Sequence, residues 1–331
     1  MEVRSNQGDQ LGLDALRTEI ERGRHRYHPA VLIHLNAQLI PHDRACVSVF
    51  DRGFLLGDGI YEGLRTTRGR VIALRHHADR MAAGLEEARI RGFDASRLGE
   101  LTAQLIEANN LTEAAVYWQV SRGVPPAGAP LRSRVPHPGS VPTVFGYAVP
   151  IKAVADYTQP EPRRLSLRPD TRWSRGHLKS ISLHGGVLAA IEAEERGCDD
   201  AVMYSGSRVS EGTATNIFIA SDGRFITPSL DSAPMLAGAT RALILEADPS
   251  IEARPITVEE LKRADEIMLT GTYTMVCAGT TLDGSPIGQH PDKPAPEHPG
   301  PMARKLLDIL LGAIDRDITA QASKPVPAGR T

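Results

Sequence analysis

Short runs of apolar and β-branched residues, each bounded by polar or glycine-containing turns, dominate the chain after residue 30. Runs of this kind predict β-strands. The predicted strands of this first part cover residues 30–36, 45–50, 59–67, 70–74, 114–123 and 141–150. Between them, apolar residues recur every three to four positions, which predicts helices over about 77–90 and 96–108. The first part of the chain is therefore expected to mix helices with a sheet.

A proline-rich stretch separates this part from a second one. Residues 150–162 contain three prolines and no clear hydrophobic period, which indicates a linker at 151–162 between domains at 30–150 and 163–317. In the second domain, the predicted strands are 164–168, 201–205, 215–220, 254–257 and 266–271, and the predicted helices are about 183–196, 240–247 and 302–314. The fold class is thus α/β of the α+β kind.

Both ends of the chain are expected to lie outside these domains. Residues 1–29 form an N-terminal extension in which the pattern predicts a short helix at about 14–24. Residues 318–331 are predicted to be a flexible tail.

Composition and charge narrow the kind of partner. The 331 residues are 41% hydrophobic, and 38 lysines and arginines nearly balance 40 acids to a formal charge of −2. No basic field is available for nucleic acid or an anionic membrane, so a small molecule is the expected partner. Three widely spaced cysteines, Cys46, Cys198 and Cys277, form no metal or disulfide pattern. The N-terminus lacks the apolar core of a secretory signal, and a cytoplasmic location is expected.

The sequence contains near matches to a dinucleotide-binding motif and to a histidine metal site, but it fits neither. The stretch GDGIYEG at 57–63 is similar to a dinucleotide-binding fingerprint, but its third glycine is one position late and a strand follows it. A nucleotide-binding or non-enzymatic protein therefore stays open only as an alternative. The adjacent His76 and His77 cannot both point towards one metal ion, and solvated histidines are the simpler interpretation. No metal site is predicted.

One lysine differs from the others. Lysine occurs only at Lys152, Lys179, Lys262, Lys293, Lys305 and Lys324. Lys179 alone lies among small and apolar residues with no acid near it in sequence, at a predicted strand-to-helix junction. A lysine that forms a Schiff base needs such surroundings, because desolvation favours the uncharged, nucleophilic amine. An ordinary lysine at the start of a helix is the alternative.

Further residues fit the same kind of site. Glu211 lies in a polar turn between apolar strands, where a buried carboxylate needs a cationic partner such as a protonated pyridine nitrogen. Residues 238–240 open a predicted helix whose free N–H groups favour an anion such as phosphate. Residues 270–272 end a strand with two hydroxyls, and Arg80 offers a bidentate donor. Each has an ordinary structural interpretation alone, so the argument depends on their order along the chain.

In that order the chain resembles the fold-type IV, class IV pyridoxal-phosphate aminotransferases. The resemblance covers about residues 30–317. Its anchors are DRGFLLGDGIYEGLR (51–65), HADRM (77–81), HLKSISLHGGVLAAIEAEERGCDDAV (177–202), VSEGTATNIF (209–218), LAGATR (236–241) and LTGT (269–272). It implies a smaller N-terminal α+β domain, a larger mixed-sheet, barrel-like domain that binds pyridoxal 5'-phosphate, and a homodimer whose subunits share each site.

The resemblance also assigns roles to individual residues. Lys179 matches the Schiff-base lysine that moves protons, and Glu211 matches the acid on the pyridine nitrogen. The phosphate ligands are matched by Arg80, Ala239, Thr240 and Thr272. Leu236 matches the residue packed on the ring, and Tyr61 matches the tyrosine beside the substrate carboxylate.

Within the family, LKSISLHGGVLAAIEAEERGC and SEGTATNIF are most similar to the D-amino-acid aminotransferases. That group carries an R-x-H pair after a T-R-G turn, which binds the substrate carboxylate from the partner subunit. Here residues 127–129 read Ala-Gly-Ala at the expected place. The R-x-R pair Arg132 and Arg134 is expected to replace it, with a solvated basic loop as the alternative.

The stretch YEGLR is more similar to the branched-chain group. It makes Gly63, which leaves room beside the cofactor, and Arg65 candidate substrate contacts. The sequence therefore predicts a ping-pong transaminase that moves the amino group of a D-amino acid to a 2-oxo acid such as pyruvate or 2-oxoglutarate. A branched-chain L-amino acid transaminase, an (R)-amine transaminase and a lyase resembling aminodeoxychorismate lyase are the alternatives.

Overall fold

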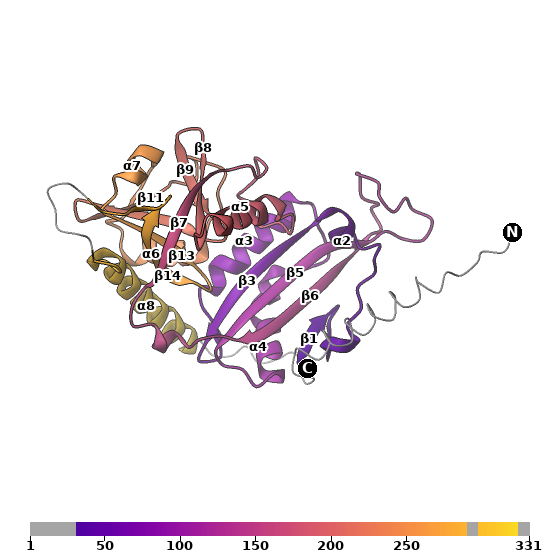
Figure 1. Cartoon of the computed structure of the whole chain (residues 1–331). Helices are drawn as coiled ribbons and strands as arrows, with labels where there is room; N and C mark the ends of the chain where they lie inside the picture. The colour runs from indigo at the N-terminus through magenta and orange to yellow at the C-terminus, as the bar shows by residue number, and fades with distance from the viewer. Residues whose placement is uncertain (1–30, 290–296, 324–331) are drawn as a thin grey trace, which may run out of the picture.

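Two β-sheets organise the molecule (Figure 1). The structure, a computed structural model, describes residues 31–289 and 297–323. The first sheet is antiparallel, with strand order β2-β1-β6-β5-β3-β4. Its strands are β1 (Leu32–Leu35), β2 (Gln38–Pro41), β3 (Gly59–Thr67), β4 (Arg70–Val71), β5 (Ala114–Val124) and β6 (Val141–Pro150).

The second sheet has nine strands in the order β12-β11-β10-β13-β14-β7-β8-β9, with β15 paired to β14. Its strands are β7 (Glu161–Pro169), β8 (Asp200–Ser205), β9 (Arg208–Gly212), β10 (Asn216–Ser221), β11 (Arg224–Thr227), β12 (Glu252–Ala253), β13 (Glu266–Gly271), β14 (Met275–Leu282) and β15 (Ser285–Pro286). The sheet curls so that β9, at one end, packs against β10. The result is the half-barrel that the family resemblance implies.

Seven α-helices and three short 3-10 helices cover these sheets in the described part of the chain. The α-helices are α2 (Arg52–Leu56), α3 (Leu74–Glu87), α4 (Leu98–Ala108), α5 (His184–Glu195), α6 (Ala239–Ala247), α7 (Val258–Lys262) and α8 (Pro301–Ala322). The 3-10 helices are η1 (His42–Arg44), η2 (Ala95–Arg97) and η3 (Val154–Asp156). Among these helices, none combines the length and the apolar composition needed to cross a bilayer.

Alternation along β3 and β5 gives the first sheet two different faces. Ile60 and Leu64 point to one face together with Val116 and Trp118, and α3 and α4 bury them in one apolar cluster. The alternate residues Tyr61 and Gly63 point to the opposite face. One side of this sheet is thus a core, while the other side is available to form part of a site.

In the second sheet, the central strands β10, β13 and β14 are buried on both faces. Phe218 belongs to a cluster that includes residues of α6 and α8, whereas its neighbours Ile217 and Ile219 belong to the cluster inside the half-barrel. Burial on both sides explains why these strands read as continuous apolar runs.

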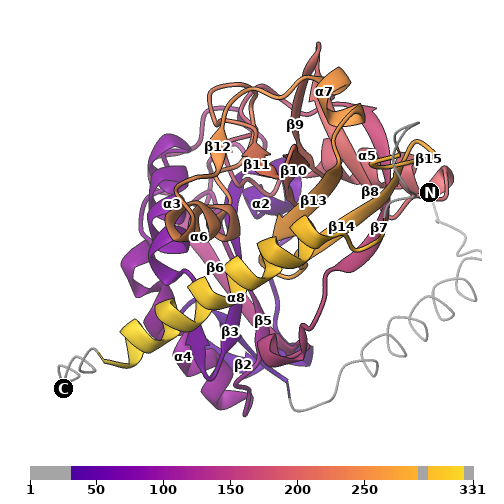
Figure 2. The same cartoon turned by 90° about the vertical axis from the view of Figure 1, so that its left-hand side faces the viewer.

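The longest helix connects the two sheets. Figure 2 shows α8 running across the molecule from β14 towards α4. Its last turns contact the first sheet, because Ile318 is buried and Gln321 Nε2 donates to the carbonyl oxygen of Val71 at 2.8 Å. The expected helix end at 314 and the expected flexible tail from 318 are therefore wrong for residues up to Ala322. The apolar period continues through Ile318 and gives these turns a packing partner.

Other expectations are also corrected. Residues 45–50 form no strand, because no neighbouring strand pairs with them, and their apolar side chains are exposed. Residues 70–74 contain only the two-residue β4 before α3 begins. The strand expected at 254–257 is replaced by β12 just before it and a single bridge at Thr257. Strand β7 begins at Glu161, inside the expected linker.

The helix expected at 14–24 lies outside the described residues. The division into domains at 30–150 and 163–317 stays a prediction.

Candidate active site

A cavity of about 100 Å³ lies where strand β3 and helix α3 meet the second sheet. Eight of the residues singled out from the sequence line it, namely Tyr61, Arg80, Lys179, Glu211, Leu236, Ala239, Thr240 and Thr272. They come from six separate segments of the chain. The structure therefore brings them into one place, and the role of each stays a prediction.

Lys179 lies on a segment held against β3. The amide of Tyr61 donates to the carbonyl oxygen of Lys179 at 2.9 Å, and the amide of Ile181 donates to Gly59 at 3.1 Å. The Lys179 Nζ lies 4.5 Å from the centroid of the Tyr61 ring. Among the described residues, no carboxylate lies within ion-pair distance of this amine. The amine thus lies over an aromatic face and forms no salt bridge with a described residue.

Glu211 forms the opposite wall and is 5% exposed. Its Oε1 accepts a hydrogen bond from Arg172 Nη1 at 2.6 Å. Its Oε2 accepts from the Leu236 amide at 3.1 Å and from Asn216 Nδ2 at 3.2 Å. Burial raises the pKa of Glu211, and the guanidinium of Arg172 opposes that rise. These three hydrogen bonds hold the carboxylate at the cavity wall. There it can accept a hydrogen bond from a protonated ring nitrogen.

Arg172 and Asn216 are cavity residues that the sequence analysis missed. Arg172 also binds Asp170 through two hydrogen bonds, at 3.0 Å from Nε and 2.8 Å from Nη2. The Asp-x-Arg spacing was the only signal in the sequence, and it does not reveal that Glu211, 39 residues away, shares the same guanidinium.

The third part of the cavity is built to hold an anion. Helix α6 has nine residues, and its N-cap Gly238 provides no side chain to satisfy the first free N–H groups. A side chain at Gly238 would collide with Asn216 Oδ1, so glycine is required there. In the same cavity, the buried hydroxyl of Thr270 has no hydrogen-bond partner. The N–H groups and the free hydroxyl are suited to a phosphate group.

Arg80 faces this anion site from α3. Its Nε and Nη2 donate to the two oxygens of Glu62 at 2.8 and 2.7 Å, and its Nη1 donates to the carbonyl of Ala237 at 2.7 Å. Since a guanidinium has five N–H donors, two remain for a ligand.

Glu62 is fully buried behind Arg80, and the sequence analysis missed it. Arg80 and His77 lower the pKa of Glu62 to about 2 in spite of its burial. Burial lowers the pKa of His77, and the Glu62 carboxylate accepts a hydrogen bond from its Nδ1 at 2.7 Å. The carboxylate therefore fixes both neighbours.

Four expected substrate residues do not line this cavity. Arg65 is fully buried and its donors point to Tyr157, Tyr273 and Lys152. Gly63 packs against the Tyr273 ring.

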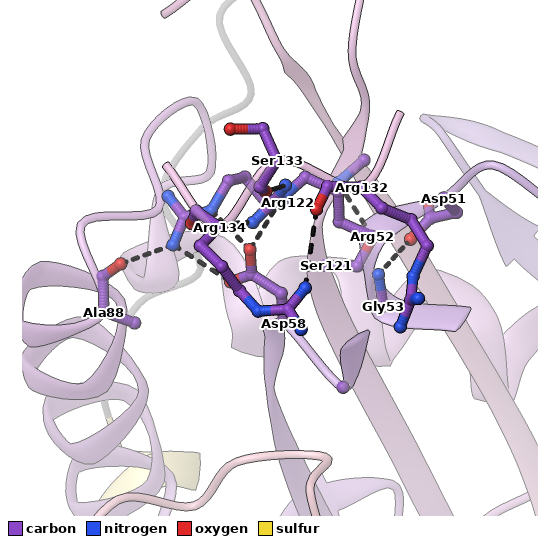
Figure 3. A network of polar contacts seen from close by, with 12 residues as sticks. Asp51, Arg52, Gly53, Asp58, Ala88, Ser121, Arg122, Arg132, Ser133 and Arg134 are labelled. Atoms are coloured by element: carbon purple, nitrogen blue, oxygen red, sulfur yellow. Dashed lines mark hydrogen bonds and ion pairs between the residues drawn. The ribbon is translucent and has the colours of Figure 1, made fainter. Parts of the chain in front are cut away.

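Arg132 and Arg134 are exposed on the loop between β5 and β6 and do not reach the cavity of their own chain. Figure 3 shows how this loop is held. Arg52 Nε and Arg122 Nε each donate to Asp58 Oδ2 at 2.8 Å. Arg52 Nη1 also donates to the carbonyl of Ser133 at 2.6 Å, which fixes the backbone between the two arginines.

Comparisons with known proteins agree with this geometry. A family model described as amino-transferase class IV matches residues 59–280. The D-alanine aminotransferase of Staphylococcus aureus (strain N315) is 30% identical over 260 residues, which cover 77% of this chain and 90% of that protein. The chain belongs to the class IV aminotransferases.

Solved structures are similar in fold. The branched-chain amino acid aminotransferase of Escherichia coli aligns with a TM-score of 0.75 at 21% identity and covers 86% of this chain and 95% of that chain. The PLP form of the branched-chain enzyme from Thermobaculum terrenum aligns with a TM-score of 0.74 at 21% identity, covering 89% and 98%. The fold is that of the fold-type IV aminotransferases, as the sequence predicts.

The cofactor of this family is pyridoxal 5'-phosphate, and the cavity fits it. A lysine amine, a buried carboxylate and an uncapped helix N-terminus all line it, and Thr270 leaves a buried hydroxyl without a partner. When bound, the cofactor supplies an aldehyde and an electron-withdrawing pyridine ring. The chain is therefore a pyridoxal-phosphate-dependent aminotransferase that acts on small amino and keto acids.

Proposed function

We propose that the protein transfers the amino group of a D-amino acid to a 2-oxo acid, with pyruvate or 2-oxoglutarate as acceptor. The observation that carries this proposal is the match to D-alanine aminotransferases over most of both chains, at 30% identity in the Staphylococcus aureus protein. Donor and acceptor use the same cavity in turn, as a ping-pong cycle requires. We place the reaction in the cytoplasm.

We assign each cavity residue a catalytic or cofactor-binding role from its position. Lys179 Nζ would hold the cofactor through its aldehyde carbon and would move the proton at the substrate Cα. Glu211 keeps a proton on the ring nitrogen, because its carboxylate is fixed by Arg172, Asn216 and the Leu236 amide. Leu236 lines the same cavity and would pack on the ring, and Tyr61, whose ring centroid lies 4.5 Å from Lys179 Nζ, would lie beside the substrate.

The phosphate ligands are Arg80, Thr272 and the first residues of α6. The free N–H groups of Ala239 and Thr240 supply directional donors at the helix N-terminus. Arg80, which is bound to the carbonyl of Ala237 next to this helix start, would add its two remaining N–H groups.

A donor comparison tests the substrate. Holoenzyme is mixed separately with D-alanine, L-leucine and (R)-1-phenylethylamine, and the absorbance of the bound cofactor is followed. The proposal predicts a rapid spectral change with D-alanine and a much slower one with the other two. A change with L-leucine alone would assign the protein to the branched-chain activity, which the YEGLR stretch favours, and a change with the amine alone would assign it to the (R)-amine activity.

We also propose a homodimer in which Arg132 and Arg134 bind the substrate carboxylate in the partner's site. Large apolar side chains are exposed near this loop, at Val135 and Val141 and on the segment ending at Phe54. Since exposed apolar side chains of this size are typical of contact surfaces, they support an association through this side of the first sheet.

Subunit mixing tests this arrangement. Lys179→Ala chains and chains carrying Arg132→Ala with Arg134→Ala are each inactive alone towards D-amino acids. If the arginines act in the partner's site, refolding an equal mixture restores about a quarter of the native activity, because half the dimers carry one complete site. Full activity of the double-alanine chain alone would return the two arginines to a solvated loop, and no recovery in mixed dimers of normal size would contradict their action in the partner's site.

A further inference from the structure

Arg65 is a buried guanidinium that joins three separate segments. It lies on β3 and is fully buried. Its Nη1 donates to the carbonyl oxygen of Tyr273 at 3.0 Å and to the hydroxyl of Tyr157 at 3.3 Å. Its Nη2 donates to the carbonyl of Lys152. The first sheet, the segment after β6 and the turn between β13 and β14 are thereby connected at one side chain.

The acceptors around Arg65 are all neutral. No carboxylate in the described part of the chain lies within 4.0 Å of the guanidinium, and its buried Nε has no hydrogen-bond partner. The buried Arg52, by contrast, pairs with Asp58, whereas the buried Arg241 likewise donates to neutral acceptors, the hydroxyl of Thr227 and the carbonyl of Pro228. A buried charge without a counter-charge is unfavourable, so an anion that comes close to Arg65 is stabilised by it.

The side chain of Tyr273 also binds the turn between β13 and β14 to the first sheet. Its hydroxyl donates to the carbonyl oxygen of Val116 on β5 at 2.8 Å. Its ring packs over Gly63, where an added methyl group would lie 3.0 Å from the hydroxyl oxygen and 3.2 Å from Cζ. The backbone and the side chain of Tyr273 are therefore both held by the first sheet.

This turn carries one of the proposed phosphate ligands. Thr272, the neighbour of Tyr273, lines the main cavity. Arg65 also lines a separate small cavity of about 10 Å³ together with Thr240 and Thr272. Arg65 therefore shares this small cavity with two residues of the proposed anion site, while it does not line the main cavity.

We propose that Arg65 is a positioning residue for the phosphate end of the cofactor. It holds the turn of Thr272 through the carbonyl of Tyr273, and its uncompensated charge favours a phosphate group in front of Thr240 and Thr272. The inference rests on the proposed phosphate site, and it replaces the substrate contact expected for Arg65 from the sequence.

Comparing two forms of vitamin B6 tests this assignment. Cofactor-free protein is titrated with pyridoxal 5'-phosphate and, separately, with pyridoxal, which has the aldehyde and the ring but no phosphate. Arg65→Met is expected to raise the Kd for pyridoxal 5'-phosphate by roughly tenfold or more, equivalent to about 1.4 kcal/mol. The Kd for pyridoxal is expected to stay within about twofold, since that ligand makes no use of the anion site.

Arg52→Met is the control, because Arg52 is also buried but lies outside the cofactor cavity. It is expected to leave both dissociation constants unchanged. Tyr273→Phe removes only the hydrogen bond to Val116 and gives a milder version of the same effect. It also provides the test if Arg65→Met does not fold.

Each outcome separates the possibilities. Equal weakening of both ligands, or an unchanged Kd with a lowered unfolding temperature, would make Arg65 a structural residue and overturn the inference. If the native protein binds pyridoxal 5'-phosphate no more tightly than pyridoxal, the proposed phosphate site itself fails, whatever the Arg65 variant does.

Discussion

Replacing Glu62 by glutamine removes the buried negative charge that fixes Arg80 and His77. In the native protein the pKa of Glu62 falls from its ordinary 4.5 to about 2. A fall of this size corresponds to about 3 kcal/mol of stability at neutral pH. Since the side chain is completely buried, solvent does not screen this contribution. We expect Glu62→Gln to lower the free energy of unfolding by about 3 kcal/mol near pH 7, because it leaves Arg80 without its counter-charge.

The pH dependence follows from the direction of the shift. A carboxyl whose pKa is lowered by folding contributes stability above its unfolded pKa and loses it as pH falls through the folded pKa. The contribution of Glu62 is therefore complete above about pH 5 and disappears between 4.5 and about 2. The glutamine variant cannot titrate, so the difference between the two proteins must shrink over this range.

Urea unfolding of the cofactor-free protein at several pH values measures this difference. Asp199→Asn is the control, because the pKa of Asp199 is also lowered to about 2, by Arg164, but on the surface. An exposed pair of this kind contributes only about 0–1 kcal/mol, and salt reduces it further. The reasoning is refuted if Glu62→Gln costs no more than the control, or if its cost is the same near pH 7 and near pH 3.

Two further predictions concern the core and the cavity. Gly146→Ala places a methyl group 2.5 Å from the buried ring of Trp118 and should lower the free energy of unfolding by about 1–3 kcal/mol. Thermal unfolding measures this loss, and an unchanged melting temperature would show that the ring is free to move. Arg172→Met removes the cation that opposes the raised pKa of Glu211, so the acid limb of the pH profile of kcat/KM should move to higher pH. An acid limb that stays in place would contradict the role assigned to Glu211.

The long strands of the fold are predictable from sequence because their environment is uniform along their length. β3 alternates between a face whose apolar side chains α3 and α4 cover and a face that carries Tyr61 and Gly63, which makes 59–67 recognisable as a strand. Residues 45–50 have the same local pattern but no neighbouring strand, and their apolar side chains stay exposed. Pairing between strands depends on tertiary contacts that a local pattern does not contain.

The same limit applies to the site. The order of motifs is enough to bring Lys179 and Glu211 to one cavity, because each lies in a distinctive stretch. Glu62 and Arg172 carry no such signal, since their partners lie 18 and 39 residues away. Arg65 shares a strand face with Tyr61, which suggests a substrate contact, but the turn at Tyr273 covers it.

Reduction of the holoenzyme with borohydride, followed by peptide mass mapping, tests the covalent attachment on which the catalytic proposal depends. Reduction makes the bond between a lysine and the cofactor permanent, so the modified peptide identifies the lysine. We predict one modified site, Lys179, and loss of the label when a D-amino acid is added before the reductant. A label on any other lysine, or none on a protein that has bound the cofactor, would contradict the account.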